Sequence, residues 1–492
     1  MSVTTMPRGT TNAPSSPITR ERIGLLLGPA LFAIAYFIPA LTGLDDAPRA
    51  VLAVTLWVAT WWITEALPIP ATSLMPIFLL PVFGGADQTT AATAYAHPIV
   101  FMYMGGFTIA IAIQKWNLHK RIAMAIITMV GSGGQRIILG VILATAFLSM
   151  WISNAATALM MLPIALALIA ELRDKRIYDE ETLRRFAKGL LLSVAYAASI
   201  GGLATLIGSV PNAVFAAVAE QNLGTTVSFA QWFFFAAPLT AVMLTFLYFY
   251  LTRIQFRVAS RTSVSSDFAR EQLKKLGRMS YEEKAVLAVF TAVGALWISS
   301  GFLPEALRLS DTSIAIIGAV SMFLLPAKQE KGGLLVWDDM KQLPWGLLLL
   351  FGGGLSLAAA FESSGLTTWF GELLGGLASL PFVLIIAALS VIVLFMTEIM
   401  SNTAVSNMLI PISIGLALGI GVDPYSIMAV VALSASCAFM LPISTPPNAA
   451  VFASDYITIS DMVKAGFWVN MFAILVINGF VLLWQPLVMS AG

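Results

Sequence analysis

Ser153-Asn154-Ala155 and Ser401-Asn402-Thr403 are two matching polar peptides in an otherwise apolar chain, and the second lies 248 residues after the first. Each is followed by a proline ten residues after its serine, at Pro163 and Pro411. A mostly apolar chain that repeats a short polar peptide once in each half predicts a single polar site built from two related halves.

The composition indicates that most of the surface of this chain faces lipid. Of 492 residues, 58% are hydrophobic and only 11% are charged, whereas a soluble domain carries about 25% charged residues. The net charge of +1 gives no electrostatic case for binding nucleic acid. One cysteine, Cys437, and two histidines, His97 and His119, exclude a disulfide framework and a Cys/His zinc site.

Eleven apolar segments are long enough to cross a bilayer, allowing for broken helices. Residues 1–22 are rich in Pro, Ser and Thr and are predicted to form a disordered cytoplasmic tail. The apolar stretch from Ile23 is too long for a signal peptide and is expected to remain as a first transmembrane helix, 23–48. The eleven expected spans lie near 23–43, 49–66, 70–83, 97–114, 190–222, 229–252, 284–303, 311–327, 344–360, 425–453 and 464–487.

Two further apolar stretches, 135–170 and 381–419, hold the Ser-Asn peptides at their centres. Each is long enough for two short helices and is interrupted by residues that favour caps and turns. Polar backbone at membrane depth is tolerated where protein or a water-filled cavity covers it. The expected fold is therefore an all-α polytopic membrane protein with about eleven transmembrane helices and two re-entrant hairpins, whose tips lie near 153–155 and 401–403.

The distribution of basic residues predicts the orientation in the membrane. With the N-terminus in the cytoplasm, 25 of the 27 Lys and Arg residues fall on the cytoplasmic side, and only Arg49 and Arg308 fall outside. This bias is the one that orients multi-pass proteins. We expect a multi-pass protein of the cell (inner) membrane.

The same threading divides the chain into two related units of opposite orientation. A first repeat spans 49–252 and a second spans 284–487, and a polar cytoplasmic linker, 253–283, joins them. Each repeat holds five spans and one hairpin. Because an odd number of spans reverses the second copy, the repeat is predicted to be inverted about an axis in the membrane plane.

Two broken helices accompany the hairpin tips. The stretches 201–212 and 441–448 combine Gly or Pro with hydroxyl side chains, and each ends on Pro-Asn. Proline inside an apolar segment breaks a helix, and glycine lets the backbone open. Helix N-termini suit anions, and unwound carbonyls and hydroxyl oxygens suit Na⁺. No Lys, Arg or His lies in the two hairpin tips or in the two broken stretches. An anion there would therefore be held by neutral donors, helix dipoles and co-bound cations.

Four other features of the sequence bear on chemistry. Glu65 and Glu398 lie in apolar segments, where an ionisable group is usually functional. Glu398 could tune cation binding, carry a proton, or hold the hairpin backbone. Gly105-Gly106 and Gly352-Gly353-Gly354 lack the Lys-Ser/Thr of a phosphate loop and indicate close helix packing. No nucleophile–base pair is present, which argues against an enzyme.

At these residues the chain resembles the divalent anion:sodium symporter family, the INDY-type dicarboxylate transporters. The matching segments are Trp61 to Pro68, the two Ser-Asn tips, Pro344 to Gly354, and Leu441 to Asn448. The resemblance implies a homodimer in which each protomer has a scaffold domain and a transport domain that moves like an elevator. It also implies uptake of C4-dicarboxylates such as succinate, malate or fumarate with Na⁺, with two or more ions.

The resemblance also assigns roles by position. The first Na⁺ site would use Ser149, Ser153, Asn154 and Gly208. The second would use Thr397, Met400, Asn402 and Ser444. Substrate would contact Asn154, Ser209, Asn402, Thr403, Thr445 and Pro446. The internal repeat supports this pairing independently, because Ser149 aligns with Thr397 and Asn154 with Asn402.

One departure from the family pattern concerns the substrate. The family has threonine after Asn154, and this chain has Ala155, which removes one hydroxyl from the first-half side of the pocket. The leading prediction is Na⁺-coupled uptake of C4-dicarboxylates. The alternatives are a sulfate or tricarboxylate carrier, a dicarboxylate exchanger without Na⁺, and, from another class, an anion channel.

Overall fold

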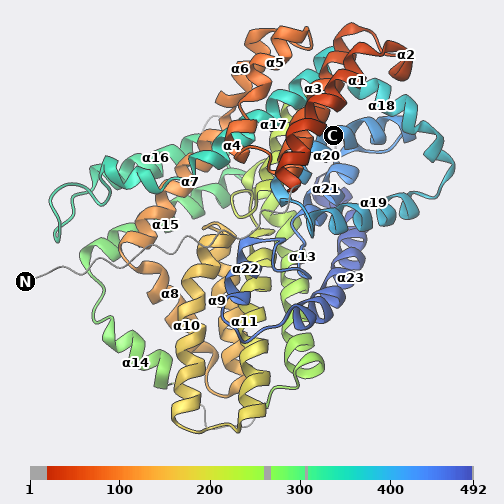
Figure 1. The fold of residues 1–492 in the computed structure, drawn as a ribbon. Helices are drawn as coiled ribbons and strands as arrows, with labels where there is room; N and C mark the ends of the chain where they lie inside the picture. The colour runs from red at the N-terminus through yellow and green to blue at the C-terminus, as the bar shows by residue number, and fades with distance from the viewer. Residues whose placement is uncertain (1–18, 260–266, 305–307, 490–492) are drawn as a thin grey trace, which may run out of the picture.

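The computed structural model describes residues 19–259, 267–304 and 308–489, and over these ranges the chain is helical, with no strand (Figure 1). Its only β feature within those ranges is an isolated bridge between Pro326 and Gly333. Seven of the described helices are long and apolar enough to cross a membrane. The residues of the expected tail up to 18 lie outside the described ranges.

The first half of the chain runs from an N-terminal helix through to a long helix that ends in a π-helical turn, Tyr250–Gln255. Its helices are α1 (Arg20–Phe37), α2 (Pro39–Thr42), α3 (Asp46–Thr64), α4 (Ile69–Thr72), α5 (Met75–Phe83), α6 (Gln88–Thr93), α7 (Pro98–Lys115), α8 (Leu118–Val130), α9 (Gly134–Ser149), α10 (Asn154–Asp174), α11 (Glu180–Gly202), α12 (Val210–Leu223) and α13 (Phe229–Phe249).

The second half follows the linker helix α14 (Asp267–Lys275). Its helices are α15 (Tyr281–Ser300), α16 (Asp311–Leu324), α17 (Trp345–Ser364), α18 (Leu366–Leu374), α19 (Phe382–Thr397), α20 (Asn402–Ile420), α21 (Pro424–Ala435), α22 (Pro446–Phe452), α23 (Ile459–Leu483) and α24 (Gln485–Val488).

The two halves repeat one order of elements. In the first half a long helix (α7), a shorter helix (α8), a helical hairpin (α9–α10), a broken helix (α11–α12) and a long helix (α13) follow one another. In the second half the same order is α17, α18, α19–α20, α21–α22 and α23. Every expected span coincides with one or two described helices, and both expected hairpins are pairs of helices joined by a few non-helical residues.

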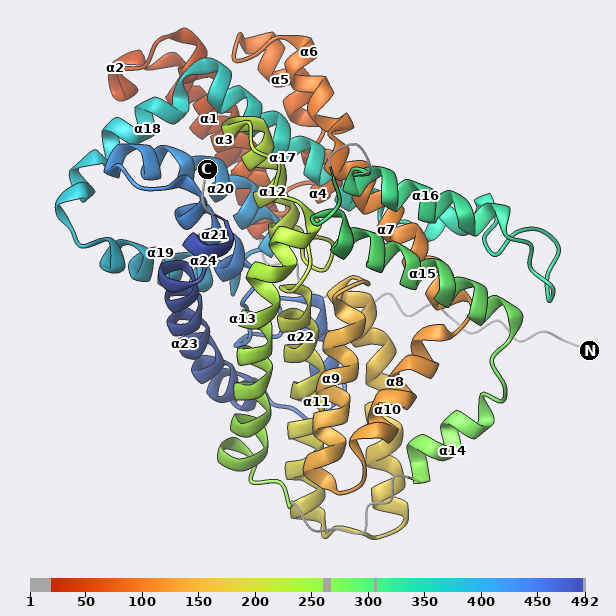
Figure 2. The same ribbon diagram turned by 180° about the vertical axis from the view of Figure 1, so that it is seen from behind.

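The two halves pack together mainly through their broken helices. The first broken helix packs against the second half through α12 with α20 and α11 with α22, and α7 packs along α16. Figures 1 and 2 show α2, α5, α6 and α18 gathered at one end of the molecule, whereas α14 and the turn between α10 and α11 lie at the other. The basic segment 171–189 and the described parts of the linker, 253–259 and 267–283, therefore lie at the same end.

Glycines allow some of these helices to approach closely, as the Gly-rich stretches predicted. A Cβ on Gly105 would lie 2.7 Å from the backbone of Ala315. A Cβ on Gly353 would lie 2.5 Å from the Ser73 carbonyl oxygen. Contacts this short exclude a side chain, because real Cβ atoms do not approach other heavy atoms within 3 Å. These glycines are therefore packing residues between helices.

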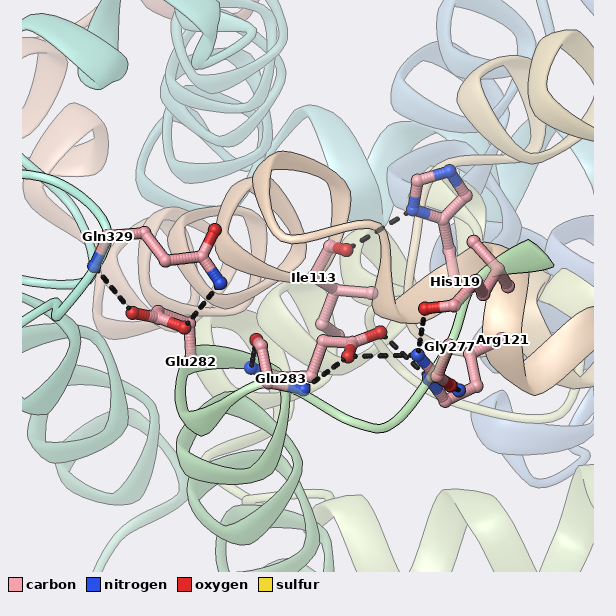
Figure 3. Close-up of polar contacts among 9 residues, drawn as sticks. Ile113, His119, Arg121, Gly277, Glu282, Glu283 and Gln329 are labelled. Carbon is pink, nitrogen blue, oxygen red and sulfur yellow. Dashed lines mark hydrogen bonds and ion pairs between the residues drawn. The ribbon is translucent and has the colours of Figure 1, made fainter. Parts of the chain in front are cut away.

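Charged side chains of α8 and α15 join the first half to the second (Figure 3). Arg121 of α8 pairs with Glu283 of α15 through an Nε–Oε1 distance of 2.8 Å and donates to the Gly277 carbonyl at 3.0 Å. Beside it, Glu282 accepts from the backbone and the side chain of Gln329 at 3.0 and 3.1 Å. Because Arg121 and Glu283 are only 13% and 8% exposed, this pair is more strongly coupled than a surface salt bridge.

Two details differ from the expectations. Helix α1 begins at Arg20, with Thr19 as its N-cap, so three residues assigned to the tail belong to the helix. Trp61 and Trp62 lie near the end of an expected span, where tryptophan often anchors a helix at the membrane interface, but Trp62 is 2% exposed and donates to the Ser73 hydroxyl at 3.0 Å. Its polar end is satisfied inside the protein, so Trp62 packs α3 against the α4 turn.

Candidate functional site

A cavity of about 790 Å³ lies where the two hairpin tips meet the two broken helices. All six residues predicted to contact substrate line it: Asn154, Ser209, Asn402, Thr403, Thr445 and Pro446. Six of the predicted Na⁺ ligands are not also predicted to contact substrate, and they fall into two groups. Ser153, Gly208, Met400 and Ser444 line the cavity, whereas Ser149 and Thr397 lie behind it. The structure thus brings residues from four distant segments to one place.

Four helices begin at this cavity. Their N-cap residues, which line its wall, are Ser153 of α10, Ser209 of α12, Ser401 of α20 and Thr445 of α22. The first turn of a helix has free N–H groups and carries a partial positive charge. α10, α12 and α20 are each 14 residues or longer, so their aligned dipoles favour a negative charge in the cavity without any cationic side chain.

The first hairpin tip builds a cluster of oxygen atoms around Asn154. One end of its amide lies 2.7 Å from the Ser149 hydroxyl, 3.0 Å from the Ala198 carbonyl oxygen and 3.1 Å from the Gly208 carbonyl oxygen. With nitrogen at this position the amide donates to all three. With oxygen there, four oxygen atoms converge, and such a cluster of uncharged oxygens is what a hard cation such as Na⁺ requires.

The second hairpin tip repeats this geometry. The Thr397 hydroxyl lies 2.6 Å from Asn402 Oδ1 and donates to the Ala435 carbonyl oxygen at 2.8 Å. In the first half, the Ser149 hydroxyl is likewise within 2.7 Å of Asn154 and 2.6 Å of the Ala198 carbonyl oxygen. Each tip is therefore tied to the broken helix of its own half by one hydroxyl, and Ser149 and Thr397 position the two asparagines from behind.

A second pair of asparagines holds the helix breaks open. Asn212 Nδ2 donates to the carbonyl oxygens of Gly202, Leu203 and Thr205 at 2.8–3.2 Å. Asn448 Nδ2 makes the equivalent set of contacts, at 3.0–3.1 Å, with Ala438 O, Leu441 O and the Ser444 hydroxyl. These bonds satisfy carbonyls that the break has removed from helical pairing, which is what buried backbone groups require.

The two breaks also touch each other across the halves. Ser209 and Ser436 share a hydrogen bond of 2.8 Å between their hydroxyls. The Tyr103 hydroxyl of α7 donates to the Ser209 carbonyl oxygen at 2.9 Å and to that of Leu206. Since Ser209 and Tyr103 both line the cavity, this network fixes the wall on which an anion would rest.

Glycine is required where the first break approaches the tip. A Cβ on Gly208 would lie 2.6 Å from the Gly202 carbonyl oxygen and 3.0 Å from that of Ser149. A Cβ on Gly202 would lie 2.5 Å from Asn154 Oδ1. A side chain at either position would push the oxygen cluster apart, so these glycines keep carbonyl oxygens close to Asn154.

Glu398, three residues before Ser401, holds the second break. Its carboxylate accepts from the backbone N–H groups of Phe439, Met440 and Leu441 at 2.8–3.1 Å and from Asn470 Nδ2 at 2.7 Å. The side chain is 3% exposed. Of the roles considered from the sequence, a structural carboxylate is the one that this geometry supports, but the backbone that it holds is that of the broken helix and not that of the hairpin.

The first-half side of the cavity has one hydroxyl fewer than the second. Ala155 and Thr403 occupy equivalent positions after the two tip asparagines, and both line the cavity. Thr403 is 8% exposed. The asymmetry seen in the sequence is therefore an asymmetry of the cavity wall.

Several residues that line the cavity were not among the predicted site residues, and Ser199, Arg20 and Glu65 are three of them. Ser199 of α11 is 1% exposed, and its hydroxyl has no hydrogen-bond partner among the described residues. Arg20 and Glu65 line the cavity and form an ion pair of 3.2 Å. Ser199 lies in an apolar helix with no breaking residue beside it, and Arg20 was assigned to the tail, so neither carried a signal in the sequence.

These features define a class of protein. Apolar helices able to cross a membrane, a repeated order of elements and paired broken helices around a polar cavity are the features of a multi-pass membrane transporter. The chain belongs to the family described as the sodium:sulfate symporter transmembrane region, whose model matches residues 20–490.

Curated relatives share much of the sequence. The chain is 42% identical over 466 residues to the sodium-dependent dicarboxylate transporter SdcS of Staphylococcus saprophyticus, covering 93% of this chain and 90% of that one. It is 40% identical over 486 residues to the transporter of the same name from Staphylococcus aureus strain MRSA252, covering 96% and 92%.

Solved structures share the fold at low sequence identity. The YdaH transporter of Alcanivorax borkumensis matches with a TM-score of 0.61 at 13% identity, covering 96% of this chain and all of that one. MtrF of Neisseria gonorrhoeae matches with a TM-score of 0.57 at 12% identity, covering 96% of each chain. At these identities the likeness concerns the fold alone.

Proposed function

We propose that this protein is a secondary active transporter that takes up C4-dicarboxylates such as succinate, malate or fumarate together with Na⁺. The observation that carries the proposal is the cavity itself. Four helix N-termini and a set of hydroxyl and amide groups surround it, and a cluster of oxygen atoms flanks it at each hairpin tip. An anion site directly beside two cation sites fits a carrier that moves both together.

Coupling between the ions and the anion follows from the charge of the wall. Apart from Arg20, no described residue that lines the cavity is cationic. A dianion at the tips would therefore depend on co-bound Na⁺ for compensation of its charge, and Na⁺ would in turn be favoured by the dianion. Such mutual dependence is a reciprocal coupling free energy between neighbouring sites. We assign the first ion to Ser149, Ser153, Asn154 and Gly208. We assign the second to Thr397, Met400, Asn402 and Ser444.

The proposed movement is that of an elevator within a homodimer in the inner membrane, with the N-terminus in the cytoplasm. The repeated order of elements supports two units of opposite orientation, because each holds an odd number of expected spans. Segment 171–189 and the described parts of the linker, 253–259 and 267–283, are rich in Lys and Arg and lie at one end of the molecule, which supports their placement in the cytoplasm. On this basis the hairpins are re-entrant, with the first open to the cytoplasm and the second to the outside.

Uptake of labelled succinate into proteoliposomes tests the proposal. We expect saturable uptake that requires an inward Na⁺ gradient, and competition by malate and fumarate. Undiminished uptake without Na⁺ would show an exchanger instead. Because the wall lacks a hydroxyl at Ala155, sulfate and citrate belong in the competition series, and stronger competition by either would reassign the substrate. Single-channel currents in place of saturable uptake would indicate a channel.

The paired ion sites make a separate prediction. Asn154→Asp and Asn402→Asp each place a charged oxygen in one oxygen cluster, and we expect each to change the Na⁺ concentration that gives half-maximal uptake. Asn117→Asp is a control, because Asn117 caps α8 and is not among the cavity-lining residues. Unchanged Na⁺ titrations in both tip variants would contradict the assignment of the two sites.

A further inference from the structure

The cavity has one charged pair on its wall, formed by Arg20 and Glu65. Among the described lining residues, Arg20 is the only cation and Glu65 the only carboxylate. An Arg20 nitrogen lies 3.2 Å from Glu65 Oε2, and their side chains are 56% and 52% exposed. All other polar groups on this wall are hydroxyls, amides or backbone atoms, so the pair is the strongest electrostatic feature that an approaching dianion meets.

Both residues stand where local structure disfavours them. Arg20 is the first residue of α1, after the N-cap Thr19, and a cation is unfavourable at a helix N-terminus. Glu65 is the C-cap of α3, and an anion is unfavourable at a helix C-terminus. Glu65 also has φ +51°, in the left-handed region that costs a residue with a side chain about 1 kcal/mol or more. Local rules are broken without local gain mainly at functional positions.

Glu65 also lies on a second hollow. A depression of about 500 Å³ is lined by Glu21 and by residues 65–70, and it shares Glu65 and Ile69 with the cavity. The ion pair therefore lies at the rim of the cavity, beside open space, and not deep among the hairpin tips. A solute that passes between this hollow and the tips passes the pair.

The ion pair between Arg20 and Glu65 is also easily replaced by a pair between Arg20 and a ligand. An ion pair between half-exposed side chains contributes little to stability, because water screens it and both side chains must be ordered. A carboxylate of a bound ligand could replace that of Glu65 on the Arg20 guanidinium at small cost, and the planar guanidinium binds carboxylates well.

We propose that Arg20 is a reception site for a carboxylate of the dianion at the rim of the cavity, and that Glu65 is the internal anion that competes for it. The ligand class is a small dicarboxylate, so the inference rests on the proposed function. Arg20 attracts the dianion and holds it transiently. Glu65 reclaims Arg20 and thereby favours release.

Opposite effects of the two neutral variants test the proposal. Equilibrium binding of labelled succinate to purified full-length protein at saturating Na⁺ is measured for Arg20→Gln, Glu65→Gln and the double variant. We expect Arg20→Gln to raise Kd about fivefold and Glu65→Gln to lower it by a factor of about two to five, in line with a partly exposed charge contact. In the Arg20→Gln background, Glu65→Gln should have no further effect, because the competition needs the guanidinium.

Two controls separate this role from a structural one. Arg22→Gln removes an exposed cation from the same turn of α1, and Arg22 is not among the lining residues, so its Kd should equal that of the wild type. Choline chloride at high concentration should reduce the Arg20→Gln effect by screening. If the pair only holds α1 to α3, both single variants break the same contact, and their Kd values would shift in the same direction.

Each outcome bears on a defined claim. Opposite shifts that vanish in the double variant support the proposal. Shifts in one direction, or Arg20→Gln equal to Arg22→Gln, overturn it while leaving the proposed function intact. Absence of Na⁺-dependent succinate binding by the wild type overturns the proposed function and this inference with it.

Discussion

Replacing Glu398 by glutamine tests whether this carboxylate holds the second helix break. In the structure, one oxygen accepts from Phe439 N, Met440 N and Asn470 Nδ2, and the other accepts from Met440 N and Leu441 N. The glutamine amide keeps one acceptor and turns an NH₂ group toward the remaining backbone donors. The Leu441 N–H then faces another donor in a buried place.

The size of the expected loss of stability follows from these contacts. An unsatisfied buried donor costs about 1–3 kcal/mol, and hydrogen bonds to a charged acceptor contribute about 1.5–3 kcal/mol, compared with about 1 kcal/mol for neutral ones. The variant leaves one buried N–H without an acceptor and gives the other donors a neutral acceptor in place of a charged one. We therefore expect the free energy of unfolding to fall by about 2–4 kcal/mol. Because Ser444 follows Leu441 by three residues, we also expect a weaker response to Na⁺.

Thermal denaturation of the purified protein, followed by tryptophan fluorescence at one scan rate with and without Na⁺, measures both effects. A fixed scan rate is needed because large membrane proteins unfold irreversibly. Glu372→Gln on the surface of α18 is the control, since Glu372 is exposed. We expect a clearly lower denaturation temperature for Glu398→Gln and a smaller stabilisation by Na⁺. If Glu398→Gln matches Glu372→Gln in both, the carboxylate does not hold the break. A stable variant with lost pH dependence of transport would instead indicate a proton carrier.

Two further predictions concern close packing and the substrate wall. A Cβ on Gly466 would lie 2.1 Å from the Phe439 carbonyl oxygen, whereas one on Gly479 of the same helix meets nothing within 4 Å. Gly466→Ala should therefore lower both the denaturation temperature and the rate of Na⁺-driven uptake. Gly479→Ala is the control and should change neither. Equal behaviour of the two variants would refute the packing argument. Thr403→Ala should raise the succinate concentration for half-maximal uptake about tenfold or more, as for a lost hydrogen bond to a charged group. Ala155→Thr should lower that concentration, and unchanged saturation curves for both would remove these positions from the substrate wall.

Much of the site followed from the repeat in the sequence. The matching Ser-Asn peptides and Pro-Asn breaks identified four segments, and the structure brings them to one cavity. The reason is physical, because a hydroxyl or amide in an apolar segment must find polar partners, and the partners available are those of the other interruptions.

Other parts of the site could not be predicted in this way. The partners of Glu398 depend on how α23 lies against the second break, which is a tertiary contact across 72 residues. Arg20 stands at the border between a Pro- and Ser-rich stretch and an apolar one, and hydropathy alone does not place a helix N-cap. Ser199 resembles any small residue of a packed helix until its neighbours are known.

The orientation of the Asn154 amide bears on how the transporter returns across the membrane without a bound ion. One end of this amide faces three oxygen atoms, those of the Ser149 hydroxyl and of the Ala198 and Gly208 carbonyls, and either the amide nitrogen or the amide oxygen can occupy that end. When the proposed Na⁺ ion departs, a half-turn of the amide about its last bond lets nitrogen take over the contacts that the ion would have made. The vacated site would then hold no buried acceptors without a donor, so the protein could return unloaded without a penalty at this position. Hydrogen bonds from the rotated amide would thus replace the contacts of the departed ion.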